Sequence, residues 1–350
     1  MLSTRKQALL TALADMRRHE QGSHGWSLFH ECLSAVADSR SCEGLDHVLS
    51  AMWRRRPYIS DAHAITLLGI AVRQLALRGG YPADVFRPDL PASHRVSALA
   101  WTLSERTREL LRLMEDHSNS YTGARRFLLP QLVVGAFAAF HGVREVRLLD
   151  LGTSIGLLPR QLNNKVIYDR FAADLRWRPA PPPFRVIPLE YVGGVDRPPL
   201  PTLEWVRACH GPSDYYERRF EEVRWSLEQA RSTGTEVDLR ALDMLDLAAL
   251  EAFLRDHRIN VVTCSFVLYQ YAGPVRAQVV DTVTRALGSP GMLLSMEPRH
   301  ALARMGSVVY AYRDDSTLPL HVADVSDGHF VGTVTVHDGL AELLGHGDGR

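Results

Sequence analysis

The sequence predicts an α/β protein in which a Rossmann-like, doubly wound sheet with an antiparallel C-terminal hairpin follows an all-helical N-terminal domain. Three observations support this fold class. Residues 1–142 show helical periodicity and no strong strand pattern. Beyond residue 143, apolar strands alternate with amphipathic helices, as they do in parallel α/β sheets. Near the C-terminus, two alternating segments flank Asp327-Gly328, a turn signal typical of a hairpin.

The composition restricts the class of protein. At 350 residues the chain exceeds the usual size of one domain, and 46% hydrophobic residues are enough for a sizeable core. Lys and Arg together number 40, as do Asp and Glu, so the net charge is zero and no nucleic-acid partner is expected. The longest apolar stretch, residues 131–142, is too short to cross a bilayer, so no membrane partner is expected either.

The cysteines and the N-terminal residues indicate a compartment. No two cysteines have the spacing of metal ligands, and the N-terminal residues do not form a secretion signal. Reduced thiols in a reducing environment are the simplest interpretation, so we expect a cytoplasmic protein. The four cysteines are Cys32, Cys42, Cys209 and Cys264.

The N-terminal helical domain is expected over residues 1–118. Apolar residues recur at helical spacing over residues 9–16 and 26–36. A third helix, residues 65–78, ends at a Gly-Gly pair followed by proline, which is a common helix stop. A fourth, long helix is expected over residues 97–116.

The second domain is expected over residues 119–350 and begins with a polar connector and an apolar helix, residues 127–140. The proline-rich segment 174–202 has the length of an insertion, and we expect it to form a lid or a substrate wall. Beyond the apolar helix, strands are expected at 146–151, 184–192, 237–243, 260–268, 291–296, 318–325 and 329–336, and helices at 157–173, 216–231, 247–257 and 275–287.

The loop after strand 146–151 fits two kinds of site. Asp150, Gly152, Ser154 and Gly156 match the pattern acidic-x-Gly-x-small-x-Gly of a nucleotide site. In such a site, backbone N–H groups and a helix N-terminus face a polar ligand. The same Gly-x-Ser-x-Gly run matches the nucleophile elbow of α/β-hydrolases.

The context favours the nucleotide site. A hydrolase elbow normally follows several strands and a His- and Gly-rich segment, whereas only helices precede this loop. A later strand ends at Asp243, where a carboxylate can meet ribose or adenine, and another ends in the small polar residues 263–265. The competing hydrolase triad would use Ser154, Asp243 or Asp324, and His329 or His337.

Taken together, these segments resemble the class I S-adenosylmethionine-dependent methyltransferases, whose sheet ends in an antiparallel hairpin. More narrowly, the chain resembles a poorly characterised bacterial family in which a helical N-terminal half precedes that core. The resemblance covers nearly the whole chain. It runs through Trp26-Ser-Leu-Phe29, 67–78, His117-Ser-Asn-Ser120, Phe127-Leu-Leu-Pro130, 149–158, Tyr168-Asp-Arg170, 198–201, 265–271 and Glu297-Pro298.

The resemblance implies that S-adenosyl-L-methionine is the cofactor, bound at the carboxyl ends of the strands. Asp150 would hold its methionine end, and Asp243 with Met244 would contact its adenine. The small residues Gly152, Ser154 and Gly156 would let the backbone approach closely. The remaining contacts implied are the amino-acid clamp Asn119, Tyr121 and Arg125, and His210 or Asp214 in place of the usual second-strand acid at the ribose.

The implied activity is methyl transfer to a small-molecule acceptor, which makes the chain a methyltransferase-like transferase. Residues 265–268 replace the Asn/Asp-Pro-Pro-Tyr motif of enzymes that methylate amino groups of DNA and proteins. Ser265 and Glu297 are candidates for polar contacts to the acceptor, and Tyr269 and Tyr271 for aromatic contacts to the sulfonium. No metal-ligand cluster is visible in the sequence, so no metal is expected.

Three other functions stay open at this point. The same site could present another carbon of the sulfonium, giving aminocarboxypropyl transfer or intramolecular cyclisation. The fold could bind the cofactor without turnover. The third alternative is the α/β-hydrolase that uses Ser154.

Overall fold

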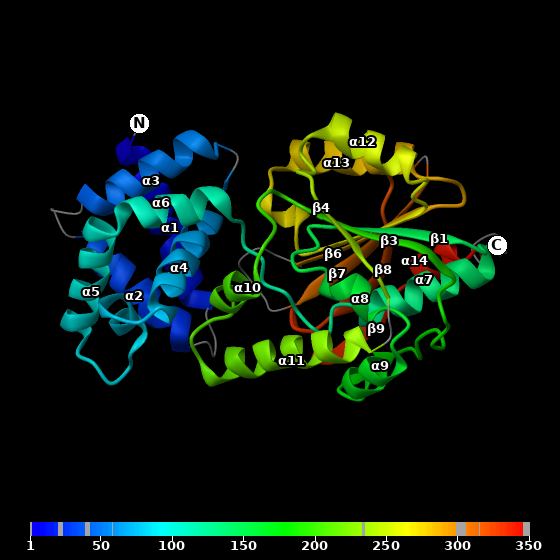
Figure 1. The fold of residues 1–350 in the computed structure, drawn as a ribbon, viewed down its shortest axis with the longest axis horizontal. Coiled ribbons are helices and arrows are strands. Elements are labelled where there is room, and N and C mark those ends of the chain that lie inside the picture. The colour runs from blue at the N-terminus through cyan, green and yellow to red at the C-terminus, as the bar shows by residue number, and fades with distance from the viewer. Residues whose placement is uncertain are drawn as a thin grey trace. The chain divides into compact units, whose positions relative to one another are not determined.

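The computed structural model describes residues 2–19, 24–38, 43–57, 59–232, 235–298, 306–314 and 316–345. The chain divides into two compact units (Figure 1). The helical unit comprises Met1–Tyr121 and Pro201–Glu221. The sheet unit comprises Thr122–Leu200 and Glu222–Arg350. Residues 201–221 therefore belong with the N-terminal helices, although they follow three strands of the sheet in the sequence.

The helical unit is built around α4, a helix with residues buried on nearly every side. The Ser60 side chain accepts a hydrogen bond from the His63 N–H, which fixes where α4 begins. In α10, the buried Trp205 donates its indole N–H to the Ser118 carbonyl at 2.8 Å. The helices are α1 (Leu2–His19), α2 (His24–Asp38), α3 (Glu43–Arg55), α4 (Asp61–Leu77), the 3-10 helix η1 (Tyr81–Phe86), α5 (Ala92–Glu105), α6 (Thr107–Asp116) and α10 (Leu203–Cys209).

The sheet unit contains one nine-stranded sheet in the order β2-β9-β8-β7-β6-β5-β1-β3-β4. From β4 to β6 the strands are parallel, and β7, β8 and β9 continue the sheet with antiparallel pairings. Counted among β1, β3, β4, β5 and β6 alone, the order is 3-2-1-4-5, which is the doubly wound order. The strands are β1 (Val146–Leu151), β2 (Leu175–Arg178), β3 (Leu189–Asp196), β4 (Asp238–Ala241), β5 (Val261–Ser265), β6 (Met292–Pro298), β7 (Ser307–Arg313), β8 (Leu320–Val325) and β9 (Gly332–Val336).

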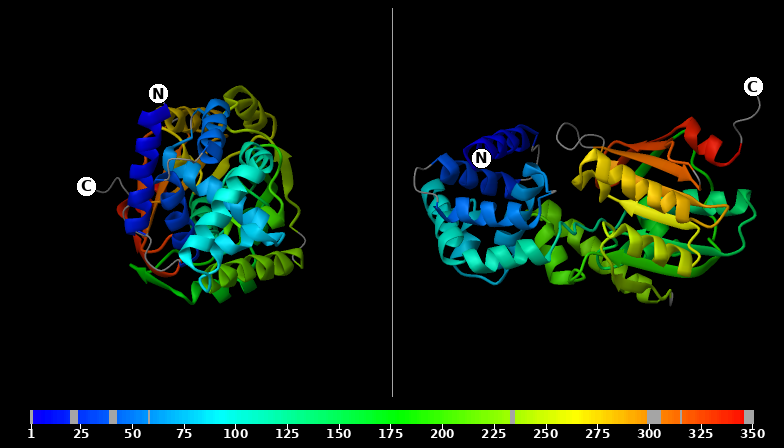
Figure 2. Two further views of the ribbon diagram at one scale, coloured as in Figure 1. Left: turned by 90° about the vertical axis from the view of Figure 1, so that its left-hand side faces the viewer. Right: turned by 90° about the horizontal axis from the view of Figure 1, so that it is seen from above.

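Helices cover both sides of the sheet (Figures 1 and 2). One apolar core, which includes Leu148, Met296 and Val309, lies beneath a first group of four helices on one face of the sheet. A second core, including Leu149 and Val262, lies beneath the other group. The first group is α7 (Leu128–Phe140), α8 (Leu157–Gln161), α9 (Lys165–Ala172) and the C-terminal part of α11 (Asp214–Arg231); the second is α12 (Leu247–Asp256) and α13 (Gly273–Ala286); the short α14 (Asp338–Leu343) packs on β8.

The predicted fold class is confirmed, including the antiparallel hairpin of β8 and β9. Within segment 174–202, where we expected a lid or substrate wall and a strand over 184–192, the structure has the edge strand β2 and the strand β3 beside β1. The expected strand stopped short of Asp196 because Gly193 and Gly194 weaken the strand pattern of β3. A Cβ on Gly194 would lie 2.7 Å from the Thr153 side chain, so the loop after β1 packs closely on this strand.

Two further findings bear on the sequence expectations. Among the described residues, no helix combines the length and apolar character that crossing a membrane requires. Cys32, Cys209 and Cys264 are buried free thiols. Cys42 lies outside the described residues.

Candidate functional site

The loop between β1 and α8 lies where the strand order reverses, because β1 has β3 on one side and β5 on the other. In doubly wound sheets, ligands bind at this point beyond the carboxyl ends of the strands. Gly152, Ser154 and Gly156 all have positive φ, at 66°, 56° and 71°. A Cβ on Gly152 would lie 2.4 Å from a Val267 methyl group, and one on Gly156 would lie 2.7 Å from a Leu239 methyl group. Both conformation and packing therefore require glycine at these two positions.

Asp150 lies inside the protein near the end of β1 and is 3% exposed. Its Oδ1 accepts a hydrogen bond from the Thr263 hydroxyl at 2.7 Å. Burial raises the pKa of the Asp150 carboxyl to about 7, against the opposing effects of hydrogen bonds and of the positive charge of Arg126. A cationic ligand group would favour the ionised form of Asp150.

Asp196 ends β3 and is joined directly to the glycine loop. Its Oδ2 accepts the Ser154 N–H and its Oδ1 accepts the Arg197 N–H, both at 2.7 Å. Burial raises the pKa of Asp196, and the neighbouring charge of Asp243 contributes to the increase. The second parallel strand of the core thus ends in an acid.

This finding corrects the position that we expected for the second-strand acid. His210 and Asp214 do not follow a sheet strand, because residues 203–209 form helix α10 and Asp214 begins α11. His210 belongs to the helical unit, where its Nδ1 lies 2.8 Å from the Val206 carbonyl oxygen. The sequence signal for Asp196 is an acid that closes the apolar run 191–195, which we had assigned in part to a lid.

Asp243 and Met244 follow β4, the neighbour of β3. The Leu242 N–H donates to the Asp196 carbonyl at 2.9 Å, which ties the two strand ends together. Asp243 is partly exposed, and its Oδ1 accepts the Leu245 N–H at 3.0 Å. Met244 is buried and belongs to the core beneath α12 and α13.

The segment after β5 contains a strained residue. Phe266 has a φ of 58°, in the left-handed region that bulky side chains rarely adopt. Its ring lies beneath the Arg126 guanidinium, with the carbon of that group 3.9 Å from the ring centroid. The buried Ser265 hydroxyl oxygen has no hydrogen-bond partner among the residues that the structure describes. Strain and an unsatisfied hydroxyl next to each other are typical of functional sites.

Glu297 supports this segment from the end of β6. Its two carboxylate oxygens accept the N–H groups of Leu268 and Tyr269, at 3.1 and 3.2 Å. Burial raises the pKa of Glu297 to about 7. In the structure Glu297 therefore positions the residues after β5. Tyr269 lies in the 3-10 helix η2 (Leu268–Gln270), and Tyr271 follows it; both are half-buried.

The expected amino-acid clamp is divided between the two units. Asn119 and Tyr121 belong to the helical unit, where the Asn119 Oδ1 accepts the Tyr121 N–H at 3.1 Å. Arg125 belongs to the sheet unit, and its buried guanidinium donates to Glu222 at 2.9 and 3.2 Å and to Asp174 at 2.6 Å. Two carboxylates thus engage Arg125, whereas the neighbouring Arg126 lies over the Phe266 ring and its positive charge acts on Asp150.

In the hydrolase hypothesis, the acid and histidine that do form a pair lie in a different part of the sheet from Ser154. The Ser154 hydroxyl accepts a hydrogen bond from the Thr122 hydroxyl at 3.0 Å. Asp324 does pair with His337, at 3.0 Å, but on β8. In the sheet order β8 is four strands from β1, which is roughly 19 Å at the usual strand spacing. This Asp–His pair is therefore too far away to activate Ser154.

The strand order and the loop define a Rossmann-like α/β protein whose candidate site lies at the carboxyl edge of its parallel strands. Residues 17–348 match the family described as "Uncharacterized protein conserved in bacteria (DUF2332)", so the chain belongs to this family, as the sequence resemblance indicated. No curated protein matches the sequence.

Several solved structures share a distant likeness. CalS10, an amino pentose methyltransferase from Micromonospora echinaspora involved in calicheamicin biosynthesis and solved with S-adenosylmethionine, is 15% identical with a TM-score of 0.27, over 56% of this chain and 65% of that one. The rRNA methyltransferase aviRa from Streptomyces viridochromogenes is 15% identical with a TM-score of 0.30, over 51% of this chain and 73% of that one. An S-adenosylmethionine-dependent methyltransferase from Clostridium acetobutylicum is 13% identical with a TM-score of 0.28, over 73% and 87%. The strand order itself defines the fold, independently of these weak likenesses.

Proposed function

We propose that the sheet unit binds S-adenosyl-L-methionine and transfers its methyl group to a small-molecule acceptor. The observation that carries this proposal is the set of three acids at one edge of the sheet. Asp150, Asp196 and Asp243 lie at or just beyond the ends of the adjacent strands β1, β3 and β4, around a loop whose φ angles are positive at three residues.

The charges of this edge favour a cationic cofactor. Carboxylates accept hydrogen bonds from ammonium and hydroxyl groups, but they repel the phosphates of a dinucleotide. S-adenosylmethionine carries an ammonium and a sulfonium and contains no phosphate. In this proposal Asp150 faces the ammonium, Asp196 accepts the ribose hydroxyls and Asp243 lies beside the adenine. Arg126 takes the carboxylate of the methionine part.

Methyl transfer needs alignment more than acid–base chemistry. A lone pair of the acceptor forms the new bond to the methyl carbon, the C–S bond breaks, and its electrons remain on sulfur as a neutral thioether. Any proton on the acceptor leaves to a base or to water. Positioning of the two reactants supplies most of the rate. Ser265, the last residue of β5, and Tyr269, in the 3-10 helix η2 that follows, are the groups that we assign to the acceptor.

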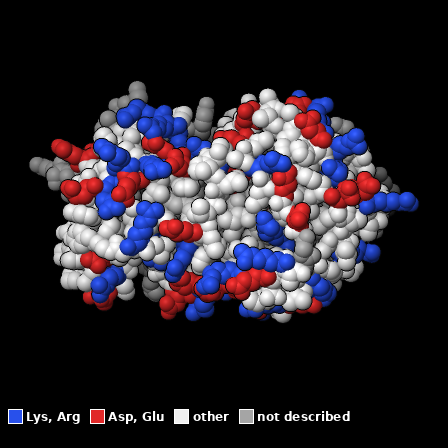
Figure 3. Space-filling view, viewed as in Figure 1, with Lys and Arg blue, Asp and Glu red and all other residues white. Residues whose placement is uncertain are grey.

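Three observations support a small-molecule acceptor. Residues 265–268 lack the Asn/Asp-Pro-Pro-Tyr motif, and the chain has no net charge. On the face shown in Figure 3, basic and acidic residues are interspersed and do not form a continuous basic surface. A polyanionic acceptor would be attracted by such a surface.

Calorimetric titration with S-adenosylmethionine and S-adenosylhomocysteine tests the proposal. We expect the wild-type chain to bind both, and Asp196→Asn to weaken binding by about 10- to 100-fold, because a hydrogen bond to a charged group contributes roughly 1.5–3 kcal/mol. Asp169→Asn is the matched control, since Asp169 is an exposed residue on α9 that pairs with Lys165. Folded wild-type protein that binds neither compound would refute the cofactor assignment.

Mass analysis of the products then tests the chemistry. Methyl transfer converts the cofactor to S-adenosylhomocysteine in proportion to a methylated acceptor. Methylthioadenosine formed without an added acceptor would instead indicate attack at another carbon of the sulfonium. Binding without either product, over a panel of small nucleophiles, would favour a non-catalytic binding protein.

A further inference from the structure

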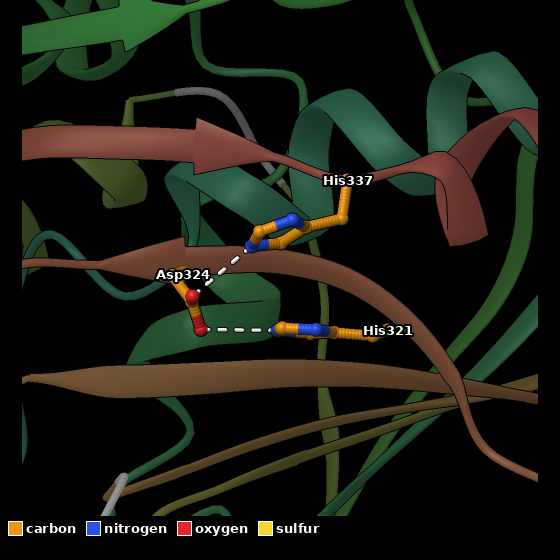
Figure 4. Close-up of side chains that lie close together, drawn as sticks. All are labelled: His321, Asp324 and His337. Atoms are coloured by element: carbon orange, nitrogen blue, oxygen red, sulfur yellow. Dashed lines mark hydrogen bonds and ion pairs between the residues drawn. The ribbon is translucent and has the colours of Figure 1, made fainter.

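Three side chains converge at the other end of the sheet from β4 (Figure 4). Asp324 lies between two histidines, and its Oδ1 and Oδ2 are each 3.0 Å from one Nε2 atom, that of His321 and that of His337 respectively. The imidazole rings are stacked, with centroids 4.0 Å apart and planes inclined by 27°. One ligand atom from each residue lies within 4.8 Å of the other two. All three side chains are half-buried.

A β-bulge brings the first histidine to this position. Side chains alternate along a strand, so residues 321 and 324 should point to opposite faces of the sheet. The pairing of β8 with β7 shifts by one residue, because Val309 pairs with Ala323 and Tyr310 pairs with His321. Val322 is thus the extra residue of β8, and Val322 and Ala323 are both buried. The bulge places His321 on the face of Asp324, and bulges commonly re-aim side chains in this way next to functional sites.

The third member comes from the neighbouring strand. Asp324 pairs with Thr335 of β9, and His337 follows that strand by one residue. Residues 335 and 337 share a face by the same alternation. Two strands held in fixed register therefore present two imidazoles and one carboxylate at a common point, without help from a flexible loop.

We propose that His321, Asp324 and His337 form a binding site for a divalent transition metal ion, with Zn²⁺ as the ion that fits best. Imidazole and carboxylate are ordinary zinc ligands, and three protein ligands leave a fourth position open for water or a substrate atom. Bonds of about 2.0–2.1 Å around a tetrahedral ion place neighbouring ligand atoms ~3.3 Å apart, close to the observed Nε2–O separations. Binding replaces the two Nε2–H···O hydrogen bonds with Nε2–metal bonds, with the ring proton of each neutral imidazole on Nδ1.

This inference does not rest on the proposed methyl transfer, and it differs from our sequence expectation that no metal binds. The test is a titration of chelator-treated full-length protein with ZnCl₂ in the absence of S-adenosylmethionine. We expect one equivalent per chain in the wild type. Asp324→Asn and His337→Gln should each weaken binding more than about 100-fold, because each removes a direct ligand.

His94→Gln is the matched control. Its Nε2 also lies beside one carboxylate oxygen, that of Asp84 at 2.9 Å, but the other Asp84 oxygen lies 3.9 Å from an Arg87 nitrogen, so a metal ion there would meet a positive charge. We expect this variant to bind zinc as the wild type does. Loss of binding in His94→Gln, or unchanged binding in Asp324→Asn, would overturn the assignment.

A second measurement needs no variant. Co²⁺ bound to the wild type should give visible d–d absorption without the strong thiolate band that cysteine ligation produces. A thiolate band would show that a cysteine binds the metal, and it would refute the proposed site. Zinc binding that fails to saturate at one equivalent would show only adventitious association and would refute it as well.

Discussion

The parallel and antiparallel halves of the sheet place their polar side chains differently. Where the sheet is parallel, helices cover both faces, so the polar groups Asp150, Asp196 and Asp243 gather at the strand ends. Where it is antiparallel, residues on one face are half-exposed, and His321 and Asp324 lie along the strand itself. In a doubly wound sheet, a ligand binds at the carboxyl ends of the parallel strands, whereas in an antiparallel extension it can bind on a face of the sheet.

The two halves also use backbone irregularity in different ways. The parallel half has a loop with left-handed residues, among them Gly152, and a strained Phe266 next to it. At the histidine–aspartate cluster of the antiparallel half, the irregularity is an extra residue within a strand, Val322. In the first half a substitution changes the conformation of a ligand loop. In the second half it changes which face a side chain occupies.

The largest expected effect is on the glycine loop. Gly152→Ala should destabilise the sheet unit by about 2–4 kcal/mol and abolish cofactor binding, because the new methyl group meets Val267 at a positive φ. Gly142→Ala is the control: its φ is also positive, at 64°, but nothing lies within 4 Å of its Cβ. It should cost about 1 kcal/mol. Hydrogen exchange of the β1 amides measures the free energy of unfolding of the sheet unit alone, and it can be applied to both variants. Equal effects of the two substitutions would show that packing at Gly152 is unimportant.

The next effect is a pH dependence of cofactor binding. Burial raises the pKa of Asp150 to about 7, and a cationic ligand binds its ionised form. Affinity should therefore be full above this pKa and fall as pH decreases through it, by about tenfold between pH 8 and pH 6. Asp150→Asn should remove this component and leave only the titration of the ligand itself. Calorimetry at several pH values measures the ratio of the two affinities; a ratio that stays constant with pH would contradict the assigned contact.

A structural feature could be predicted from the sequence when it depends on local patterns, and it was missed when it depends on contacts between distant segments. The alternation of strands and helices is local, so the fold class and the glycine loop could be predicted. Asp196 was missed because Gly193 and Gly194 hide the strand pattern, and their reason, the close approach of Thr153, exists only in the folded sheet. In the histidine–aspartate cluster, Asp324 and His337 were named only as possible hydrolase residues, and His321 was missed for a similar reason. Period-two alternation separates His321 from Asp324, and the extra residue becomes visible only from the pairing with β7.

The smallest expected effect concerns the independence of the two halves. In metal-free protein, His321→Gln removes one hydrogen bond between half-buried groups, so it should lower the free energy of unfolding by about 1 kcal/mol or less. It should leave the dissociation constant of S-adenosylmethionine unchanged, since β8 lies four strands from β1 and sites so far apart usually act additively. Urea unfolding and calorimetry on the same variant measure the two quantities. With zinc added, the wild type should gain stability that the variant lacks, because an ion that binds only the folded state stabilises it by mass action. If substituting His321 changed the cofactor affinity while the free energy of unfolding stayed the same, the histidine–aspartate cluster and the candidate cofactor site would act as one site.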